Sequence, residues 1–411
     1  MGDSDLIQRI KSGIPEKKMS IEKPLLDLFA IDSSFTDEQR MVRDAVRSFA
    51  REVFAPRVPD CFRDETFPND LIPQIGQLGF LGANLEGYGC AGMDSTAYGI
   101  LMRELEYVDS GLRSFASVQG ALCMFPIYRF GNEEQKQRFL PKMATGEMIG
   151  CFGLTEPDSG SDPSSMRTRA KKVEGGYVLN GAKMWITNSP IADVCIVWAK
   201  VDSDDAKSIR GFLVEREFEG LTTPKTTGKY SLRASLTGEI VLEDVFVPEE
   251  NMLPEVQGLK GPLSCLTQAR YGISWGVLGA ALCCFETALH YSTDRVQFDK
   301  PIAGFQLTQK KLVDMGARIV HGHLLSHHLA KLKDAGKLTP IQVSLAKREN
   351  VQTALDIARE SRSILGANGI MEEYPILRHS MNLESVYTYE GTHEVHTLAI
   401  GRALTGLSAF S

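Results

Sequence analysis

One acidic residue near the C-terminus of this 411-residue chain, Glu390, stands between an aromatic ring, Tyr389, and a glycine, Gly391. A glycine permits a tight turn or the close approach of a ligand because it has no Cβ. A carboxylate beside an aromatic ring is easily desolvated, and desolvation raises its pKa and suits it to proton transfer. Most acidic residues are solvated surface charges. Glu390 is therefore a candidate base only if the rest of the chain supplies a reaction.

A second candidate is the loop at residues 151–162, which is rich in glycine and hydroxylated side chains and follows a strand-like run. Backbone N–H groups and hydroxyls in such a loop bind phosphates or the polar edge of a ring. A plain turn explains the loop about equally well. Residues 87–92 match G-x-G-x-x-G, but no β-branched strand precedes them and no βαβ alternation surrounds them. We therefore expect a glycine-rich loop between helices there, not a dinucleotide-binding fold.

Composition excludes several classes of protein. The net charge of −7 argues against nucleic-acid binding. The eight cysteines include no C-x-x-C pair, so neither a metal site nor a disulfide framework is predicted. No apolar run looks long enough to span a bilayer. Residues 1–34 have no apolar signal core and are expected to form a polar leader that lies over the surface or is partly disordered.

The elements that position these residues follow from periodicity. Residues 35–149 are predicted to be mainly helical, with helices near 36–53, 71–80, 94–108 and 133–145. Thr36 and Gln39 form a capping box at the first, and Met41, Val42 and Val46 belong to its apolar face. Residues 150–262 contain alternating runs at 177–179, 193–198, 211–214 and 239–242, typical of an antiparallel β barrel or sandwich. Asn180-Gly181 predicts a hairpin turn between two strands.

Residues 263–411 predict an antiparallel helical bundle, with long helices over 264–293, 307–334 and 340–365 and two shorter ones flanking Glu390. Thr339, Pro340 and Gln342 give a start signal for the third. The fold class is thus α+β, in the order helical domain, β domain, helical bundle.

Four separate motifs occur in an order that resembles the acyl-CoA dehydrogenases. They are residues 151–162, 184–189, 294–298 and 389–392. The resemblance implies FAD at a domain junction and a homotetramer. It assigns the flavin ring to Phe152, Leu154, Thr155, Gly160, Ser161, Trp185, Ile186 and Thr187. It assigns the rest of the cofactor to Arg295, Phe298, Gln306, Ser363, Leu365, Gly366, Ala367, Thr392 and Glu394, with Arg295 and Gln306 supplied by a neighbouring subunit. Three residues depart from the usual pattern. The family commonly has Gln or an acid in place of Ser363, and a glycine in place of both Ala367 and Asp299.

By the same resemblance Glu390 is the general base. Oxidation of a thioester removes an α proton and passes a β hydride to flavin N5. The base then needs a pKa raised from about 4.3 toward neutrality.

Residues 103–117 resemble the branch of this family that acts on glutaryl-CoA. The resemblance pairs Arg113 with the distal carboxylate, helped by Ser114 and Ser117, with Glu106 nearby. A carboxylate that enters an apolar pocket must meet a cation or lose much solvation energy. An ordinary salt bridge at a helix end would also explain Arg113. The remaining residues that the resemblance places around the CoA and acyl group are Ser161, Leu263, Thr267, Arg270, Tyr389 and Gly391.

The expected activity is FAD-dependent oxidative decarboxylation of glutaryl-CoA to crotonyl-CoA and CO2, with electrons passed to electron-transfer flavoprotein. Tyr389 and Glu106 are associated with the decarboxylating type. Two alternatives remain: a short-chain acyl-CoA dehydrogenase or oxidase acting on butyryl-CoA, and a catalytically silent acyl-CoA-binding relative. The expected location is the cytoplasm of a bacterium or the mitochondrial matrix of a eukaryote.

Overall fold

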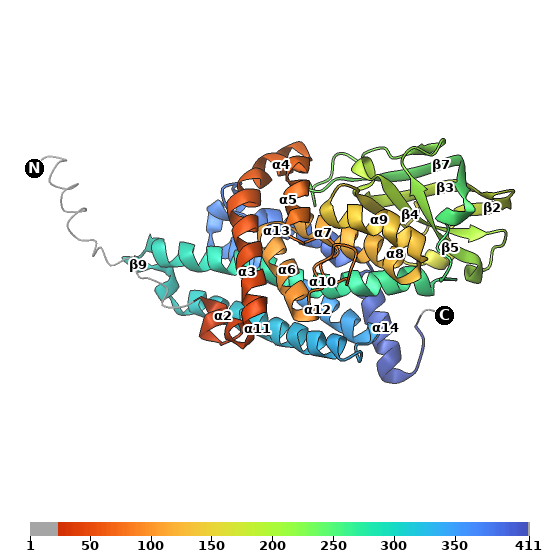
Figure 1. Cartoon of the computed structure of the whole chain (residues 1–411). Helices are drawn as coiled ribbons and strands as arrows, with labels where there is room; N and C mark the ends of the chain where they lie inside the picture. Colours follow the sequence, from red (N-terminus) through yellow and green to blue (C-terminus); the bar gives the residue numbers. More distant parts are fainter. Residues whose placement is uncertain (1–23, 410–411) are drawn as a thin grey trace, which may run out of the picture.

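The computed structural model describes residues 24–409. Helices from the first and last thirds of the chain pack together, and the β-sheet lies at one end, on the right in Figure 1. Most of the predicted leader, residues 1–23, lies outside the described residues. Its described end is packed into the protein, because Leu26 and Ile31 are buried and Asp32 accepts a 2.9 Å hydrogen bond from Arg103.

The N-terminal helices are α2 (Leu25–Leu28), α3 (Asp37–Ser48), α4 (Val58–Asp64), α5 (Ile72–Gln77), α6 (Ser95–Val108), α7 (Ser110–Ser117), α8 (Phe125–Phe130) and α9 (Glu133–Thr145). Four of them, α3, α5, α6 and α9, follow the predicted positions, whereas α2, α4, α7 and α8 were not predicted. The Thr36–Gln39 capping box is confirmed, with bonds of 3.2 and 3.1 Å. Met41 was wrongly assigned to the buried face and is 72% exposed. It precedes the buried Val46 by five residues, which turns it about 140° away around the helix.

Residues 78–94 contain no strand, so the G-x-G-x-x-G match lies in a loop between α5 and α6, as predicted.

The middle of the chain forms a seven-stranded curled sheet with the order β1-β4-β2-β3-β7-β6, and β5 pairs with β4. Its strands are β1 (Gly150–Gly153), β2 (Arg169–Val173), β3 (Gly176–Thr187), β4 (Val194–Val201), β5 (Ile209–Glu215), β6 (Leu221–Thr222) and β7 (Thr237–Pro248). Most pairs are antiparallel, but β4 runs parallel to both β1 and β2. The sheet is therefore mixed rather than purely antiparallel. Parallel neighbours need a crossover, and β3 supplies it because it lies between both partners and β4 in the sequence.

The hairpin predicted at Asn180-Gly181 is wrong. Both residues lie inside β3, where the register against β7 shifts. The Asn180 side chain exchanges two 2.9 Å hydrogen bonds with Asp244, and Gly181 (φ +147°) fits where a Cβ would come within 2.6 Å of the Thr168 hydroxyl. The pair thus forms a β-bulge. The true hairpin turn precedes β3 at Gly175, whose φ is +76°.

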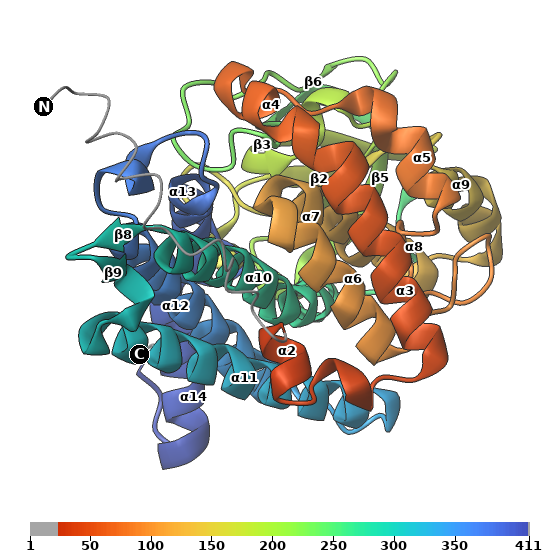
Figure 2. The ribbon, with the colours of Figure 1, turned by 90° about the vertical axis from the view of Figure 1, so that its left-hand side faces the viewer.

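The C-terminal bundle is confirmed. It consists of α10 (Lys260–Asp294), α11 (Gln306–Asp334), α12 (Pro340–Ile364), α13 (Ile376–Thr388) and α14 (His393–Thr405), with the small hairpin β8 (Val296–Gln297) and β9 (Lys300–Pro301). In Figure 2, α10 lies between α6 and α12, which are its main packing partners. Gly279 permits this contact, because a Cβ there would meet the carbonyl oxygen of Arg103 at 1.9 Å.

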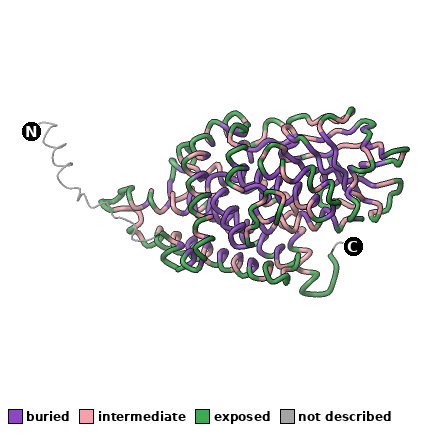
Figure 3. The backbone as a smooth tube through the Cα atoms, viewed as in Figure 1, coloured by how far each residue is buried: buried purple, intermediate pink, exposed green. Residues whose placement is uncertain are grey.

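Contrary to the expectation from sequence, α10 is long and apolar enough to cross a membrane, alone among the helices within residues 24–409. Its most apolar stretch is 83% buried inside the protein, however. Helices packed on several sides explain this composition, and Figure 3 shows the buried backbone running through the centre of the bundle. α10 is thus a core helix.

Candidate active site

Glu390 lies in the tight loop between α13 and α14, where its own φ is +53° and that of Gly391 is +95°. A left-handed conformation costs a non-glycine residue about 1–2 kcal/mol. Two cationic side chains hold the loop in this shape. Arg270 of α10 donates to the carbonyl oxygen of Glu390 at 2.6 Å. Lys347 of α12 donates to the carbonyl oxygens of Tyr389 and Gly391 at 3.0 and 2.8 Å.

The carboxyl group of Glu390 has the properties of a base. Burial raises its pKa above the ordinary range, although Arg113, Arg270 and Lys347 lower it in part. Its Oε2 atom is buried and accepts no hydrogen bond from the described residues. Because no side chain occupies this oxygen, it is free to accept a proton from a ligand.

Arg113, on α7, is only 1% exposed and lies close to the loop between α13 and α14 that carries Glu390, here called the base loop. Its Nε donates to Glu106 Oε2 at 2.6 Å, and its Nη2 donates to the Tyr389 hydroxyl. The Ser114 hydroxyl lies 3.4 Å from the same Tyr389 oxygen. The structure therefore brings together the predicted base and the predicted carboxylate anchor, which come from the last and first thirds of the chain.

Several buried polar atoms around Arg113 have no hydrogen-bond partner among the described residues. They include Glu106 Oε1, the Ser117 hydroxyl and Glu390 Oε2. Buried polar atoms are normally paired, and unpaired ones that converge on one place indicate a ligand or ordered water.

The predicted acyl and CoA contacts on α10 share one face of the helix. Leu263, Thr267 and Arg270 recur at helical spacing, and the face leads from the half-exposed Leu263 to the Glu390 loop. The Thr267 hydroxyl donates to the Leu263 carbonyl oxygen at 2.9 Å, so its hydrogen is used within the helix.

The predicted flavin motifs also meet. The N–H of Met184, on β3, donates to the Thr155 carbonyl oxygen at 2.9 Å, which joins the 151–162 loop to the strand that ends at Thr187. Phe152, Leu154 and Ile186 are buried beneath this junction. Gly160 and Ser161 lie exposed at the outer end of the loop.

A buried ion pair supports this loop from below. Lys183 donates to Glu156 at 2.8 Å and to the Leu154 carbonyl oxygen at 3.3 Å. Glu156 also accepts from the N–H groups of Arg167 and Thr168 at 2.6 and 3.0 Å. Burial opposes the ionisation of Glu156, but Lys183 and these hydrogen bonds outweigh it and hold its pKa below the ordinary range.

Trp185 leaves the regular strand at a register shift in β3. Its φ is +61° and its side chain is 58% exposed, although tryptophan is rarely so open. Bulges beside binding sites commonly re-aim one side chain in this way. The indole is therefore exposed on the strand that joins the Thr155 loop to Thr187.

One asparagine links the three regions of the site. Asn382, on α13, accepts from the Leu232 N–H at 2.8 Å and donates to Asp109 Oδ2 at 3.0 Å. Asp109 caps α7, the helix of Arg113, by accepting from the Gly111 N–H at 2.7 Å. The loop of Leu232 reaches the flavin motif, because the N–H of Asn188 donates to Leu236 at 2.8 Å.

The residues predicted to hold the adenosine end are not united with the flavin motifs in one chain. Arg295, Phe298 and Gln306 are exposed around the β8–β9 hairpin, at the opposite end of the molecule from the sheet (Figure 1). Phe298 is 88% exposed, and Phe298 and Asp299 both have positive φ, in keeping with the glycine usual at the second position.

The other predicted adenosine contacts lie along α12 and α14. Leu365 is buried and Gly366 and Ala367 are exposed after the end of α12. Ser363 accepts a 3.0 Å hydrogen bond from Lys311. Thr392 caps α14 by accepting from the Val395 N–H at 3.2 Å, and Glu394 is exposed.

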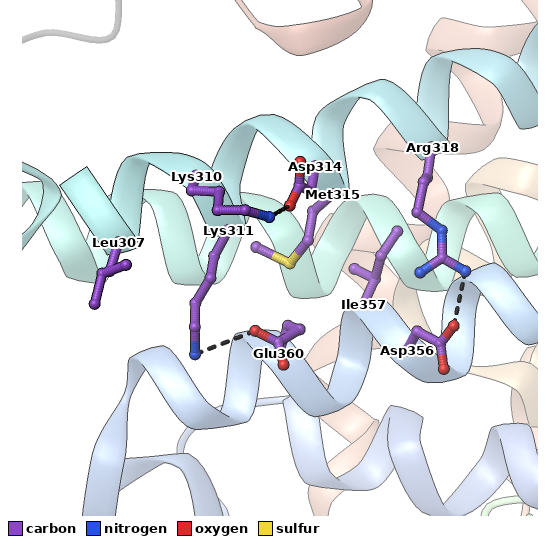
Figure 4. Close-up of a pocket in the computed structure, with 9 residues that line it drawn as sticks. All are labelled: Leu307, Lys310, Lys311, Asp314, Met315, Arg318, Asp356, Ile357 and Glu360. Atoms are coloured by element: carbon purple, nitrogen blue, oxygen red, sulfur yellow. Dashed lines mark hydrogen bonds and ion pairs between the residues drawn. The ribbon is translucent and has the colours of Figure 1, made fainter.

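A groove of about 430 Å³ between α11 and α12 adjoins Ser363 but contains none of the predicted site residues (Figure 4). It is lined by Leu307, Lys310, Lys311, Asp314, Met315, Arg318, Asp356, Ile357 and Glu360. Its cations are paired with its own acids, through Lys310–Asp314, Lys311–Glu360 and Arg318–Asp356. The groove is therefore not the place where the chemistry described above converges.

Comparison with known proteins decides the family. The models of all three domains of the acyl-CoA dehydrogenases match in order: the N-terminal domain at residues 36–147, the middle domain at 151–245 and the C-terminal domain at 256–405. The chain belongs to the acyl-CoA dehydrogenase family.

Individual relatives of the enzyme differ in substrate. A solved glutaryl-CoA dehydrogenase from Mycobacterium smegmatis, in complex with FADH2, is 50% identical with a TM-score of 0.92, over 94% of this chain and 99% of that one. An acyl-CoA dehydrogenase of Bacillus subtilis is 37% identical over 90% of this chain and 99% of its own. A short-chain-specific acyl-CoA dehydrogenase of Megasphaera elsdenii is 36% identical over 91% and 100%.

FAD is the cofactor of this family, and the flavin motifs fit it. The hydroxyls of Thr155 and Thr187 are half-buried, and neither makes a hydrogen bond within the described residues. With the exposed Trp185 indole, they offer a flat apolar surface and polar contacts to a ring. When bound, FAD supplies the acceptor for a hydride.

Several residues of the dehydrogenase site were missed from sequence. Lys347 and Asn382 sit within helices that carry no local signal for them. Gly276 could have been found, because Gly272, Gly276 and Gly279 share one face of the predicted helix. A Cβ at Gly276 would lie 2.2 Å from Glu106 Oε2. Helix α10 therefore packs directly against Arg113 and Glu106, here called the anchor pair.

Proposed function

We propose that this enzyme catalyses the oxidative decarboxylation of glutaryl-CoA to crotonyl-CoA and CO2. The observation that carries the proposal is Arg113, whose guanidinium is 1% exposed and donates to the hydroxyl of Tyr389, the neighbour of the base in the chain. Its Nε and Nη2 have protein partners, and the structure records no hydrogen bond from its Nη1 among residues 24–409.

The polar atoms around Arg113 favour a substrate that ends in a carboxylate. A methyl-terminated acyl chain would leave the Ser117 hydroxyl and Arg113 Nη1 desolvated without partners, at a cost of about 1–3 kcal/mol for each. A carboxylate pairs with both. Glu106 already balances part of the Arg113 charge at 2.6 Å, so the neighbouring hydroxyls contribute to holding the second anion.

The residues suggest a reaction in three steps. Glu390, with its raised pKa, removes the α proton of the thioester, and the β hydrogen leaves as a hydride. The bond between the γ carbon and the distal carboxylate then breaks, releasing CO2 and leaving its electron pair in a dienolate. Protonated Glu390 returns its proton to the γ carbon, which completes crotonyl-CoA and regenerates the base. Tyr389, bonded to Arg113, lies between the two reacting ends.

The second candidate is a short-chain acyl-CoA dehydrogenase acting on butyryl-CoA. It is supported by the short-chain-specific relative of Megasphaera elsdenii. An oxidase would use the same base and pass electrons to O2. It would produce stoichiometric peroxide from butyryl-CoA without any other acceptor. A silent acyl-CoA-binding relative would show no flavin bleaching, and the unpaired Glu390 Oε2 speaks against it.

We further propose electron-transfer flavoprotein as the acceptor and a homotetramer as the assembly. The separation of Arg295 and Gln306 from the flavin motifs supports a site completed by a neighbouring copy of the chain. The domain limits 35–149, 150–262 and 263–411 and the cytoplasmic or mitochondrial location also stay proposals. Sedimentation of the FAD-loaded enzyme tests the subunit number.

The experiment that tests the substrate compares Arg113→Met with the wild type on glutaryl-CoA and butyryl-CoA. We expect kcat/KM for glutaryl-CoA to fall at least about a hundredfold, since a buried charge pair is lost. The kcat/KM for butyryl-CoA should fall far less. Arg113→Met/Glu106→Gln is the control, because it leaves no unpaired buried carboxylate. Equal losses on both substrates in both variants would mean that Arg113 is structural.

A further inference from the structure

Tyr98, on α6, carries a buried hydroxyl that the reaction described above does not use. The residue is 3% exposed, and its hydroxyl has no hydrogen-bond partner among the described residues. Burial raises its pKa to about 12, although Arg113 and Ser117 oppose the shift. The hydroxyl therefore keeps its proton at neutral pH and is a donor that faces these two residues.

Helix α10 fixes the place of this hydroxyl relative to the anchor. A Cβ at Gly272 would lie 3.3 Å from the Tyr98 hydroxyl, and a Cβ at Gly276 would lie 2.2 Å from Glu106 Oε2 and 3.2 Å from Arg113 Nε. Gly272 and Gly276 are one turn apart on the same face of the helix. The Tyr98 hydroxyl thus lies one turn before the anchor pair, on the side toward Arg270 and the base loop.

The donors around the anchor do not satisfy a carboxylate without Tyr98. A carboxylate has two oxygens and about four acceptor positions. Arg113 has committed Nε to Glu106 and Nη2 to Tyr389, so it cannot present a full two-nitrogen fork to the ligand. In the described part of the chain, the donors left without protein partners are Arg113 Nη1 and the hydroxyls of Ser117 and Tyr98, and the first two alone fill only part of these positions. Glu106 Oε1 is also unpaired, so Tyr98 is not bonded to it.

We propose that the Tyr98 hydroxyl donates a hydrogen bond to the distal carboxylate of the acyl group and selects dicarboxylic over monocarboxylic acyl-CoA. This inference rests on the proposed function and adds a residue to it. The selection has two parts. The hydroxyl stabilises a bound carboxylate, and it destabilises a bound alkyl chain, which leaves the hydroxyl desolvated and unpaired.

The test is Tyr98→Phe, which removes the hydroxyl and keeps the ring. Anaerobic flavin bleaching gives the apparent Kd and the limiting reduction rate for glutaryl-CoA and for butyryl-CoA. We expect the Kd for glutaryl-CoA to rise at least about tenfold, because a hydrogen bond to a charged group is lost. The Kd for butyryl-CoA should stay within about twofold or fall. Tyr271→Phe is the matched control, since its ring stacks on Tyr98 at 6.4 Å but its hydroxyl donates to Ser95. Tyr271→Phe should leave the Kd unchanged for both substrates.

Three results would overturn the inference. No change with either substrate means that the hydroxyl does not touch the ligand. Equal weakening of both substrates means that Tyr98 only supports the fold. A wild-type enzyme that is bleached by butyryl-CoA and not by glutaryl-CoA refutes the proposed function itself, and is recognised before any variant is made.

Discussion

Replacement of Asn382 by alanine should disturb the active site more than its distance from the chemistry suggests. The side chain joins α13, which leads into the base loop, to Leu232 and to Asp109 at 2.8 and 3.0 Å. Asn382→Ala leaves the Leu232 N–H and one Asp109 contact unsatisfied inside the protein. Two such losses, one of them to a carboxylate, amount to about 3 kcal/mol of unfolding free energy.

The catalytic effect separates positioning from stability. A displacement of about 1 Å between reacting groups costs on the order of a hundredfold in rate. We expect Asn382→Ala to slow anaerobic flavin reduction at least about tenfold at saturating acyl-CoA. The control is Asn350→Ala, because Asn350 is also buried and donates to Ser274 and Ser326 at 2.8 and 3.0 Å, within the bundle alone. Asn350→Ala should lose similar stability in urea and keep its reduction rate. Equal rates in Asn382→Ala and wild type would refute the idea that this contact aligns the site.

Three further predictions follow from the site. Burial raises the pKa of Glu390, so flavin reduction should fail on acidification at a higher pH than a solvated glutamate would cause. The stability that Glu390 contributes is present at low pH and lost as pH rises through the raised pKa. Glu390→Gln should therefore have a higher Tm than the wild type toward alkaline pH. The variant should also lose turnover, because the base is gone, and keep FAD. Lys183→Met leaves Glu156 buried without its cation, which should cost about 3 kcal/mol in unfolding free energy and release FAD during gel filtration. Gly276→Ala should displace Glu106 and lower kcat/KM for glutaryl-CoA at least about tenfold, more than for butyryl-CoA.

The glycine prediction has a control within the chain. Gly401 is also inside a helix, but a Cβ there would meet nothing within 4 Å. Gly401→Ala should leave both substrates unchanged and stabilise the protein by about 0.5–1 kcal/mol through helix propensity alone. If Gly276→Ala behaves like Gly401→Ala, the close contact with Glu106 has no consequence for the substrate.

Local patterns predicted the longer helices and most strands, because capping residues and apolar spacing act within a few residues; the short helices α2, α4, α7 and α8 were missed. The Thr36–Gln39 capping box and the three long C-terminal helices are examples. The turn predicted at Asn180-Gly181 was wrong because a tertiary contact decides the local structure. The Asn180 side chain bonds to Asp244, 64 residues away, and this contact stabilises a bulge instead of a turn. The parallel pairs of β4 were missed because register between distant strands leaves no mark in a local pattern.

The site was predictable where family motifs carry it and not where it depends on contacts between helices. The convergence of Glu390 and Arg113 is of the first kind. The contacts of Lys347 with the base loop are of the second, because a lysine within a helix reads as a surface charge until α12 is placed against α13 and α14. The role proposed for Tyr98 could likewise not be predicted from the sequence, since an aromatic residue on an apolar face normally belongs to the core.

The proposal that this enzyme oxidises and decarboxylates glutaryl-CoA is tested most directly by one anaerobic experiment on the wild type. Glutaryl-CoA labelled with ¹³C at its distal carboxyl is mixed with the FAD-loaded enzyme, and flavin absorbance, labelled CO2 and the acyl products are followed together. We predict that the flavin bleaches and that about one labelled CO2 and one crotonyl-CoA form for each flavin reduced, since Glu390 and the Arg113 anchor act on the same molecule. Bleaching by butyryl-CoA without bleaching by glutaryl-CoA would contradict the substrate. Bleaching by glutaryl-CoA without release of labelled CO2 would contradict the decarboxylation.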